Sequence, residues 1–582
     1  MSSAEKLAKT RASMAQQGID AFIVPYADAF QSRNRAAEGA DRLQWLTGFR
    51  GSAGTAVVAA KNAAVFVDSR YTLSARSQID TKLFGIIDEA GGIKPQDWAK
   101  DKGIVGYDPF LHTAGDLGQY KKAGVTLKPV TQNPVDSAWG DKGIPQRGAI
   151  AHDVKYAGKP VAEKIDEITQ IVRDAGYQAA AITRPDSVSW LLNVRVPALP
   201  VVPVVHGYVL LDAVNGHVTL FTDVDCSDPA ITTQFANRVT VRPLAEVGQG
   251  LQALTQHLKN WSLDDFNTPV WFRENLEASG ARVAHAMDPV TWPKACKNAV
   301  EQAGIRASHI RDGVALVRFM HHIDSHPGLS ERDIEQLVLK TRARDESCFT
   351  CSFDPIVGFN ENGAFVHGQV PDEQVKKVEG NGLLLIDSGG QYLDGTTDVT
   401  RTLAIGKPSA EMKRCFTLVM KGHIALASAV FPEGTPGVAL DALARQYLWA
   451  AGLDYAHGTG HGVGYCLNVH EGPCNFSSKP LRASEPLKPG ILMSNEPGYY
   501  REGGFGIRLE NLCLVVSAGQ SGFLQLETVT MAPFDTRALD LSLMTEAEKV
   551  WLNDYHATVR KILFPLLEPE IAAWLTDATA PV

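Results

Sequence analysis

Five residues in the C-terminal half of the chain have the types and local contexts of a divalent-metal site: Asp387, Asp398, His461, Glu496 and Glu510. A structural zinc site needs fewer acidic ligands than these four carboxylates and one imidazole provide, so the set indicates two cations and a bound water. Donors that are only oxygen and imidazole favour hard or borderline ions, Mn²⁺ first, with Co²⁺ or Zn²⁺ able to compete. The chemistry open to such a site is hydrolysis.

The two aspartates belong to a predicted pair of strands. The apolar residues 383–386 lead to Asp387, turn signals follow, and residues 396–405 are predicted to return as a strand that carries Asp398. Side chains from adjacent antiparallel strands can point to one face at close range, which two carboxylates that share cations require. This strand pair is therefore predicted to form half of the site.

The two glutamates follow the same plan further along the chain. Residues 491–494 lead to Glu496, the pair 497–498 (Pro-Gly) breaks the strand, and a second strand carries Glu510 before the apolar run 512–516. The predicted site is thus the meeting point of two hairpins.

Histidines and glycines lie between the two hairpins in the sequence. His457, His461 and His470 fall in a segment with glycines at 458, 460, 462 and 464, which let the backbone approach a ligand closely. A fourth histidine, His367, lies earlier. A neutral imidazole suits a metal ligand or a proton shuttle near pH 7, so one histidine could bind metal while the others act on substrate.

The elements that must position these residues fall into three segments, separated by Gly/Pro-rich joints at 133–159 and 288–293. We expect α/β domains at 1–150 and 151–291 and a third domain at 292–582 that ends in a helical extension. The first two domains are expected to share one plan: a helix that ends at a glycine, a strand, a Trp-Leu pair and two further strands. In the first domain these are Gly18, 21–25, 45–46, 55–59 and 64–68. In the second they are Gly176, 179–183, 190–191, 207–211 and 218–222.

The third segment is predicted to open and close with helices. Capping-box pairs predict helix starts at Ser330 (with Asp333) and at Thr545 (with Glu548), and further helices are expected at 411–431 and 440–451. Two apolar helix faces are predicted: Val300, Ala303, Ala307, Ile310, Val314 and Val317 on the first helix, and Val550, Tyr555, Val559 and Ile562 on the last.

Composition excludes several classes of protein. A net charge of −9 over 582 residues is too mild for a nucleic-acid partner. The N-terminus lacks an apolar segment, and the most apolar later stretch, 196–211, is broken by prolines, so we expect no membrane contact and a cytoplasmic protein. The eight cysteines are sparse, and Cys348 and Cys351 are interpreted as packing thiols.

At these motifs the chain resembles the pita-bread metallopeptidases, and among them the three-domain Xaa-Pro aminopeptidases (aminopeptidase P). The resemblance covers nearly the whole chain, including LTGFRGSAGTAVV, VDSRYTLSARSQ, SVSWLLNVR, the predicted hairpins and the tail LMTEAEKVWLNDYHATVRKILFPLL. It implies two creatinase-N-terminal-like α/β domains followed by a pita-bread catalytic domain, within an α/β and α+β multidomain chain. It also implies a homodimer, although the apolar C-terminal helix could equally pack on its own domain.

The resemblance also implies a role for each site residue. Asp387 would bind one metal ion, Asp398 and Glu510 both, and His461 and Glu496 the other, with a bridging water or hydroxide as nucleophile and Glu496 as proton acceptor. Further residues would act on substrate: His367 and His470 at the scissile bond and its tetrahedral intermediate, His457, Tyr500 and Arg508 near a proline ring, and Phe353 in the pocket for the first residue. The implied substrates are peptides with proline in second position.

Two alternatives stay open at this point. A prolidase-like Xaa-Pro dipeptidase is disfavoured because two domains precede the catalytic one here. A pita-bread module that binds peptides without catalysis is disfavoured because all five metal ligands are present.

Overall fold

The computed structural model describes residues 1–32, 35–140, 142 and 147–582. It divides into two compact units: a first unit of residues 1–199 and 203–294, and a second unit of residues 295–582 and 200–202. Part of the predicted first joint, residues 141 and 143–146, lies outside the described residues. The domain ranges 1–150, 151–291 and 292–582 stay a prediction.

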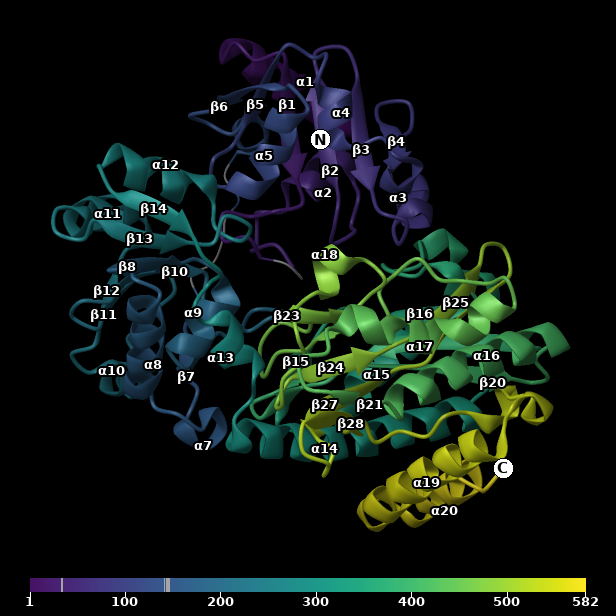
Figure 1. The fold of residues 1–582 in the computed structure, drawn as a ribbon. Coiled ribbons are helices and arrows are strands. Elements are labelled where there is room, and N and C mark those ends of the chain that lie inside the picture. The colour runs from purple at the N-terminus through teal and green to yellow at the C-terminus, as the bar shows by residue number, and fades with distance from the viewer. Residues whose placement is uncertain (33–34, 141, 143–146) are drawn as a thin grey trace. The chain divides into compact units, whose positions relative to one another are not determined.

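The first unit contains two six-stranded sheets of the same topology, which confirms the predicted repetition of one plan (Figure 1). The strand orders are β4-β3-β2-β1-β5-β6 and β12-β11-β10-β8-β13-β14. The directions also correspond: β1 runs antiparallel to β2 and parallel to β5, and β8 runs antiparallel to β10 and parallel to β13. The buried apolar residues of each sheet form the cores of this unit.

The first sheet and its helices are as follows: β1 (Ala21–Pro25), β2 (Thr55–Ala59), β3 (Ala63–Val67), β4 (Gly85–Asp88), β5 (Ile104–Tyr107), β6 (Thr126–Pro129), α1 (Ser3–Gln16), α2 (Arg42–Thr47), α3 (Thr72–Gln78), α4 (Pro95–Ala99), α5 (Ala114–Lys122) and α6 (Pro134–Trp139). The elements up to the second unit are β7 (Ile150–Ala151), β8 (Ala179–Ile182), β9 (Val194–Arg195), β10 (Gly207–Asp212), β11 (His217–Thr222), β12 (Val239–Arg242), β13 (Asn260–Leu263), β14 (Arg282–His285), α7 (Val154–Ala157), α8 (Val161–Asp174), α9 (Pro185–Leu191), α10 (Pro229–Phe235), α11 (Val247–Thr255), α12 (Val270–Ala278) and α13 (Thr291–Ala295).

The second unit combines short antiparallel sheets with long helices. Its largest sheet has the order β21-β28-β27-β24-β22-β23, and a three-stranded sheet has the order β16-β17-β20. The strands are β15 (Cys348–Cys351), β16 (Ile356–Phe359), β17 (Gly382–Ser388), β18 (Gly390–Tyr392), β19 (Gly395–Thr396), β20 (Val399–Ile405), β21 (Val430–Pro432), β22 (Gly460–Gly462), β23 (Glu471–Phe476), β24 (Leu492–Asn495), β25 (Gly498–Arg501), β26 (Phe505–Arg508), β27 (Asn511–Ser517) and β28 (Phe523–Thr528). The helices are α14 (Ala299–Ser325), α15 (Glu331–Arg342), α16 (Ala410–Ala427), α17 (Gly437–Ala450), α18 (Pro480–Ala483), α19 (Glu546–Leu563) and α20 (Pro569–Ala578).

The capping boxes at Ser330 and Thr545 are confirmed as the N-caps of α15 and α19. The helix predicted over 411–431 ends earlier, because Val430–Pro432 pairs with β28 as strand β21. Backbone pairing with a distant strand thus overrides the local apolar pattern.

Both predicted helix faces need correction. Val300 and Ala303 are exposed on α14, whereas Val317 is buried and Ile310 and Val314 pack against the core as predicted. The helix also buries polar side chains such as His309 and Asp312. On α19, Val550 is exposed, whereas Tyr555 and Val559 are buried as predicted and Ile562 packs beside them. These α19 residues share a core cluster with Phe416 and Met420 of α16 and Phe534, so α19 packs on its own unit. The homodimer stays a prediction.

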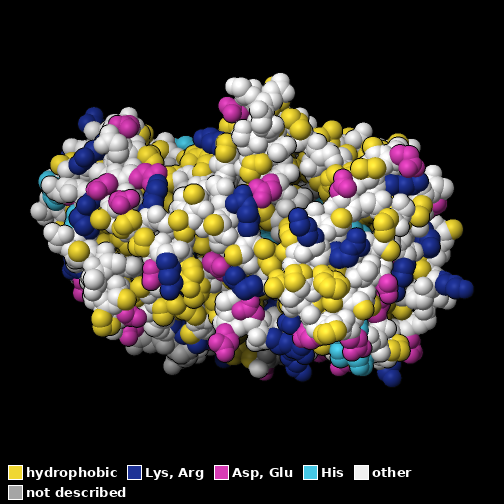
Figure 2. All heavy atoms as spheres, turned by 90° about the horizontal axis from the view of Figure 1, so that it is seen from below, with side chains coloured by type: hydrophobic (Ala, Val, Ile, Leu, Met, Phe, Trp, Pro, Cys, Tyr) yellow, Lys and Arg dark blue, Asp and Glu magenta, His cyan; other side chains and the backbone are white. Residues whose placement is uncertain are grey.

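In the described part of the chain, no helix is long and apolar enough to cross a membrane. On the face in Figure 2, Lys and Arg side chains are interspersed with Asp and Glu side chains. All eight cysteines lie within the described residues and are free thiols, with Cys348 and Cys351 half-buried on β15.

Candidate metal centre

The first strand pair is confirmed as β17 and β20, which run antiparallel with Asp387 opposite Thr400. Asp387 lies near the end of β17, whereas Asp398 immediately precedes β20 and is not part of the strand as predicted. Both side chains are buried. A buried carboxylate is costly unless it is paired, protonated or bound to metal, so these positions demand a partner.

The second strand pair is a long hairpin interrupted at the two glutamates. Strand β24 pairs with β27 and β25 pairs with β26, and Glu496 and Glu510 lie in the gaps between these pairings. Pro497 cannot donate to the ladder, although its carbonyl accepts from the Leu509 N–H at 3.2 Å. Because Glu496 and Glu510 both lie in the unpaired stretch between Asn495↔Asn511 and Gly498↔Arg508, the interruption of the hairpin brings the two acids close together.

The two hairpins meet at Thr400. Its hydroxyl donates to Glu510 Oε2 at 2.9 Å, and its carbonyl accepts from the Glu510 N–H at 3.1 Å. This contact joins the three-stranded sheet to the largest sheet and brings the bridging candidates Asp398 and Glu510 together.

His461 reaches the same place from β22. Its Nδ1 lies 2.9 Å from the Gly462 carbonyl, which can only accept, so Nδ1 carries the proton and Nε2 the lone pair. Nε2 lies 3.6 Å from Asp398 Oδ2 and 3.4 Å from Glu496 Oε1. A lone pair that faces two carboxylates is repelled unless a cation or a proton lies between them.

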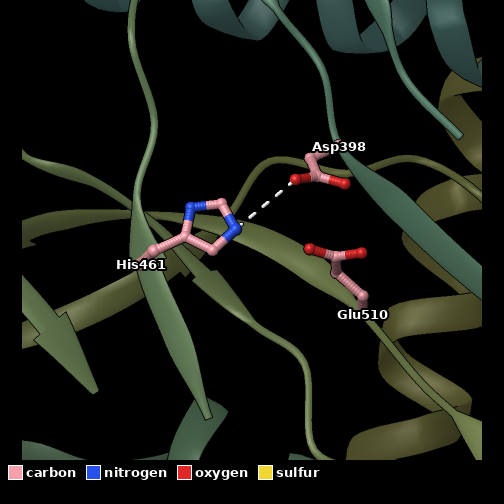
Figure 3. A group of neighbouring side chains, drawn as sticks. All are labelled: Asp398, His461 and Glu510. Atoms are coloured by element: carbon pink, nitrogen blue, oxygen red, sulfur yellow. Dashed lines mark ion pairs between the residues drawn. The ribbon is translucent and has the colours of Figure 1, made fainter. Parts of the chain in front are cut away.

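Figure 3 shows Asp398, His461 and Glu510 pointing toward one another from different segments of the chain. One ligand atom of each residue lies within 4.8 Å of those of the other two. Gly460, next to His461, permits the close approach of β22 to β24, because a Cβ there would lie 2.0 Å from the Ser494 carbonyl oxygen. The glycine therefore accommodates a neighbouring strand, whereas the sequence suggested approach to a ligand.

The acids of the site repel one another strongly. Burial and then the neighbouring Asp387 raise the pKa of Glu510 to about 8. Burial, followed by the charge on Glu510, raises the pKa of both Asp398 and Glu496 well above the usual range. Among the described residues, Asp387 Oδ1 and Glu510 Oε1 are buried without a hydrogen-bond partner. Carboxylate oxygens and one imidazole in this state fit divalent cations, which would supply the missing positive charge.

Three residues predicted to bind substrate form a hydrogen-bonded chain beside the acids. Arg508 donates to Asp387 Oδ2 at 2.5 Å through Nη2 and to the Tyr500 hydroxyl at 2.7 Å through Nη1. The Tyr500 oxygen lies 2.9 Å from His457 Nε2. His457 Nδ1 faces the Gly458 carbonyl at 2.7 Å, so Tyr500 donates its proton to Nε2. This chain ties the predicted substrate side of the site to the predicted metal ligand Asp387.

The remaining predicted residues are less closely joined. The His470 ring lies against the His461 ring, with centroids 4.3 Å apart. His367 is half-buried and follows Val366, whose carbonyl accepts from Arg508 Nη1 at 3.4 Å. Phe353 is half-buried after β15, and among the described residues no hydrogen bond, ion pair or ring contact joins it to the other predicted site residues. The roles of all three stay predictions.

Several supporting residues were not identified from the sequence. The Thr400 hydroxyl donates to Glu510, the Ser494 hydroxyl donates to Glu496 Oε1 at 3.3 Å, and the Thr459 carbonyl accepts from the Glu496 N–H at 2.8 Å. A threonine two residues after Asp398 on an alternating strand faces the same side as that acid, which was the available signal for Thr400. Ser494, two residues before Glu496, carried the same signal, whereas Thr459 carried none.

Comparison with known proteins agrees with this geometry. Residues 303–517 match the model of metallopeptidase family M24, 6–136 and 142–301 match creatinase/prolidase N-terminal domains, and 522–582 match the C-terminal region of peptidase M24.

Individual relatives match along the whole chain. Aminopeptidase P2 of Arabidopsis thaliana is 37% identical over 99% of this chain and 88% of its own length. A probable Xaa-Pro aminopeptidase P of Aspergillus flavus is 35% identical over 100% of this chain and 93% of its own. The crystal structure of X-prolyl aminopeptidase from Caenorhabditis elegans, described as a cytosolic enzyme with a di-nuclear active site, is 31% identical, covers 100% of both chains and has a TM-score of 0.94. The chain therefore belongs to the M24 metallopeptidases, in their aminopeptidase P group.

Proposed function

We propose that the chain is a metal-dependent aminopeptidase that hydrolyses the N-terminal Xaa-Pro bond of peptides. The observation that carries this proposal is the convergence of Asp398, His461 and Glu510, with ligand atoms within 4.8 Å of one another, where the two strand pairs meet. The names of relatives 35–37% identical along the chain support the substrate class.

The proposed ligand assignment is the one that the family resemblance implies. Asp387 would hold one cation, Asp398 and Glu510 both, and His461 and Glu496 the other. When bound, the cations would lower the pKa of a water and polarise the scissile carbonyl. Glu496 Oε1 lies 3.4 Å from His461 Nε2, so its carboxylate borders the same space and can accept the proton of an attacking water.

The other side of the site addresses the substrate. The bond to proline is a tertiary amide without an N–H, so the enzyme needs a shaped pocket for the ring and donors to the carbonyl. We assign the ring pocket to His457, Tyr500 and Arg508, whose hydrogen-bonded chain is buried or half-buried. His367 and His470 would donate to the developing oxyanion, and Phe353 would line the pocket for the first residue.

Finer properties extend this proposal. Four carboxylates and one imidazole suit two divalent cations per chain, and donors that are oxygen and imidazole only favour Mn²⁺ over Co²⁺ or Zn²⁺. A cytoplasmic location is supported by the cytosolic enzyme of Caenorhabditis elegans. The homodimer rests on the family resemblance.

The test combines metal removal with a choice of peptides. Chelated protein should lose activity and regain it with Mn²⁺, because the buried acids at Asp398 and Glu510 need a counter-charge. The restored enzyme should cleave Xaa-Pro-Yaa and leave Xaa-Ala-Yaa and the dipeptide Xaa-Pro intact. Cleavage of the dipeptide alone would select the prolidase alternative, and cleavage of none would revive the binding module.

A further inference from the structure

A buried arginine on β20 lies directly behind the bridging candidate Glu510. Arg401 is 4% exposed and follows Thr400, whose hydroxyl bonds the Glu510 carboxylate. Through Nη1, Arg401 donates to the carbonyls of Thr400 at 2.9 Å and of Glu510 at 2.5 Å. The guanidinium therefore holds the Glu510 backbone, while Thr400 holds its side chain.

The other donors of Arg401 reach the start of the C-terminal region. Nε donates to the Pro533 carbonyl at 3.0 Å, and Nη2 donates to the Ala532 carbonyl at 2.7 Å and to Asn511 Oδ1 at 2.8 Å. The guanidinium carbon also lies 4.0 Å from the centre of the Phe534 ring. All three nitrogens of the Arg401 guanidinium are thus used, and they join residues 510–511 to residues 532–534.

The last partner of Arg401 comes from helix α19. Nη2 donates to the Tyr555 hydroxyl at 3.1 Å, and this hydroxyl lies 2.8 Å from the Ala532 carbonyl and 3.0 Å from the Thr530 carbonyl. Tyr555 therefore accepts from Arg401 and donates to the segment that Arg401 also binds. The hydroxyl fixes the position of the guanidinium relative to α19.

None of the acceptors of Arg401 among the described residues is a carboxylate. A buried cation without an ion pair is costly, so carbonyl oxygens and the nearby acids of the site must offset its charge. Replacement by lysine would not be conservative, because an ammonium cannot reproduce this planar fork of donors.

We propose that Arg401 and Tyr555 are positioning residues that hold Glu510 in its metal-binding geometry, so that the C-terminal region supports the metal centre. This inference rests on the proposed function, since it assumes that Glu510 is a metal ligand. Residues that orient a ligand from behind typically change metal affinity about 10–100-fold when they are removed.

The test is a calorimetric titration of metal-free protein with Mn²⁺. Tyr555→Phe keeps the buried ring and removes only the hydroxyl, and we expect at least one of the two binding steps to weaken about tenfold. Arg401→Lys should weaken it further. Glu548→Gln is the matched control, because Glu548 also lies on α19 but pairs with Lys421 of α16 at 2.6 Å, away from Arg401. It should lower the melting temperature and leave both affinities as in the wild type.

The outcomes separate the positioning role of Arg401 and Tyr555 from the proposed metal-dependent function. Wild-type affinities in Tyr555→Phe would overturn the positioning role, and so would an equal loss of affinity in Glu548→Gln, which would indicate general loosening of α19. Wild-type protein that takes up no Mn²⁺ would instead overturn the proposed function and the inference with it.

Discussion

At the scale of single residues, Glu496 has the most demanding position in the site. Its N–H donates to the Thr459 carbonyl at 2.8 Å, and its Oε1 lies 3.3 Å from the Ser494 hydroxyl and 3.4 Å from His461 Nε2. Both ends of the residue are therefore held, by the histidine segment and by β24. A carboxylate fixed this way can bind a cation and accept a proton without reorganisation during the reaction.

Glu496→Gln should lower kcat by about three orders of magnitude, which corresponds to about 4 kcal/mol of barrier. The amide has the same shape but cannot accept the proton. Steady-state kinetics on Xaa-Pro-Yaa in Mn²⁺ would measure the effect, together with the metal content of the variant. Glu502→Gln, on the exposed turn between β25 and β26, is the control and should match the wild type. A kcat for Glu496→Gln within tenfold of wild type would contradict the proposed base.

His367 offers a second test at this scale. If its imidazole stabilises the transition state, His367→Ala should lower kcat more than it raises KM, because the lost interaction is absent in the ground state. Kinetics with saturating Mn²⁺ would separate the two constants. A rise in KM at constant kcat would make His367 a simple binding residue.

At the scale of elements, helix α17 holds the segment that carries the histidines. Arg445 Nε donates to Asp441 Oδ2 at 2.7 Å, and its Nη2 and Nη1 donate to the carbonyls of His457 at 2.7 Å and Tyr455 at 2.6 Å. Asp441 Oδ1 accepts from the Thr459 hydroxyl at 2.6 Å. One buried ion pair on a regular helix thus fixes a glycine-rich segment that has little structure of its own.

Arg445→Lys should therefore lower kcat/KM at least tenfold and the melting temperature as well. A lysine has one point charge and cannot serve three acceptors in a plane, so a buried carbonyl of the histidine segment would lose its donor. Arg306→Lys is the control, since the Arg306–Glu527 pair is half-exposed and such pairs contribute about 0–1 kcal/mol. Equal effects of the two substitutions would argue against a special role for α17.

The elements also show what the sequence could and could not predict. Asp387 and Glu496 were singled out because each follows an apolar run, and Asp398 and Glu510 because each lies on the predicted returning strand of the same hairpin. Both patterns are local. The pairing of Arg508 with Asp387 was not predicted, because it joins strands 121 residues apart. Val430 was wrongly assigned to a predicted helix for the same reason. Its strand pairing with Gln525 is a long-range contact that the neighbouring residues do not reveal.

At the scale of the whole molecule, two neutral histidines are built into the second unit around Arg401. His556 of α19 accepts from the Phe534 N–H at 3.0 Å through Nε2. His423 of α16 lies with its ring centroid 5.2 Å from that of Phe534. Burial and then Arg401 lower the pKa of His423 to about 3 and that of His556 to about 4. The packing of the C-terminal region thus requires uncharged imidazoles.

Acid should therefore destabilise the second unit. The pKa of His556 falls from 6.5 in the unfolded chain to about 4 in the folded one, so between these values the unfolded state binds more protons. Stability then rises with pH across this window and is lost as pH falls from about 6.5 to about 4.

His556→Gln retains an acceptor for the Phe534 N–H and cannot gain a proton. Its melting temperature should be lower at pH 7 but should fall less between pH 7 and pH 5 than that of the wild type. His285→Gln, at a half-exposed site in the first unit, should keep the wild-type slope. An unchanged slope in His556→Gln would mean that acid acts on the second unit through other groups.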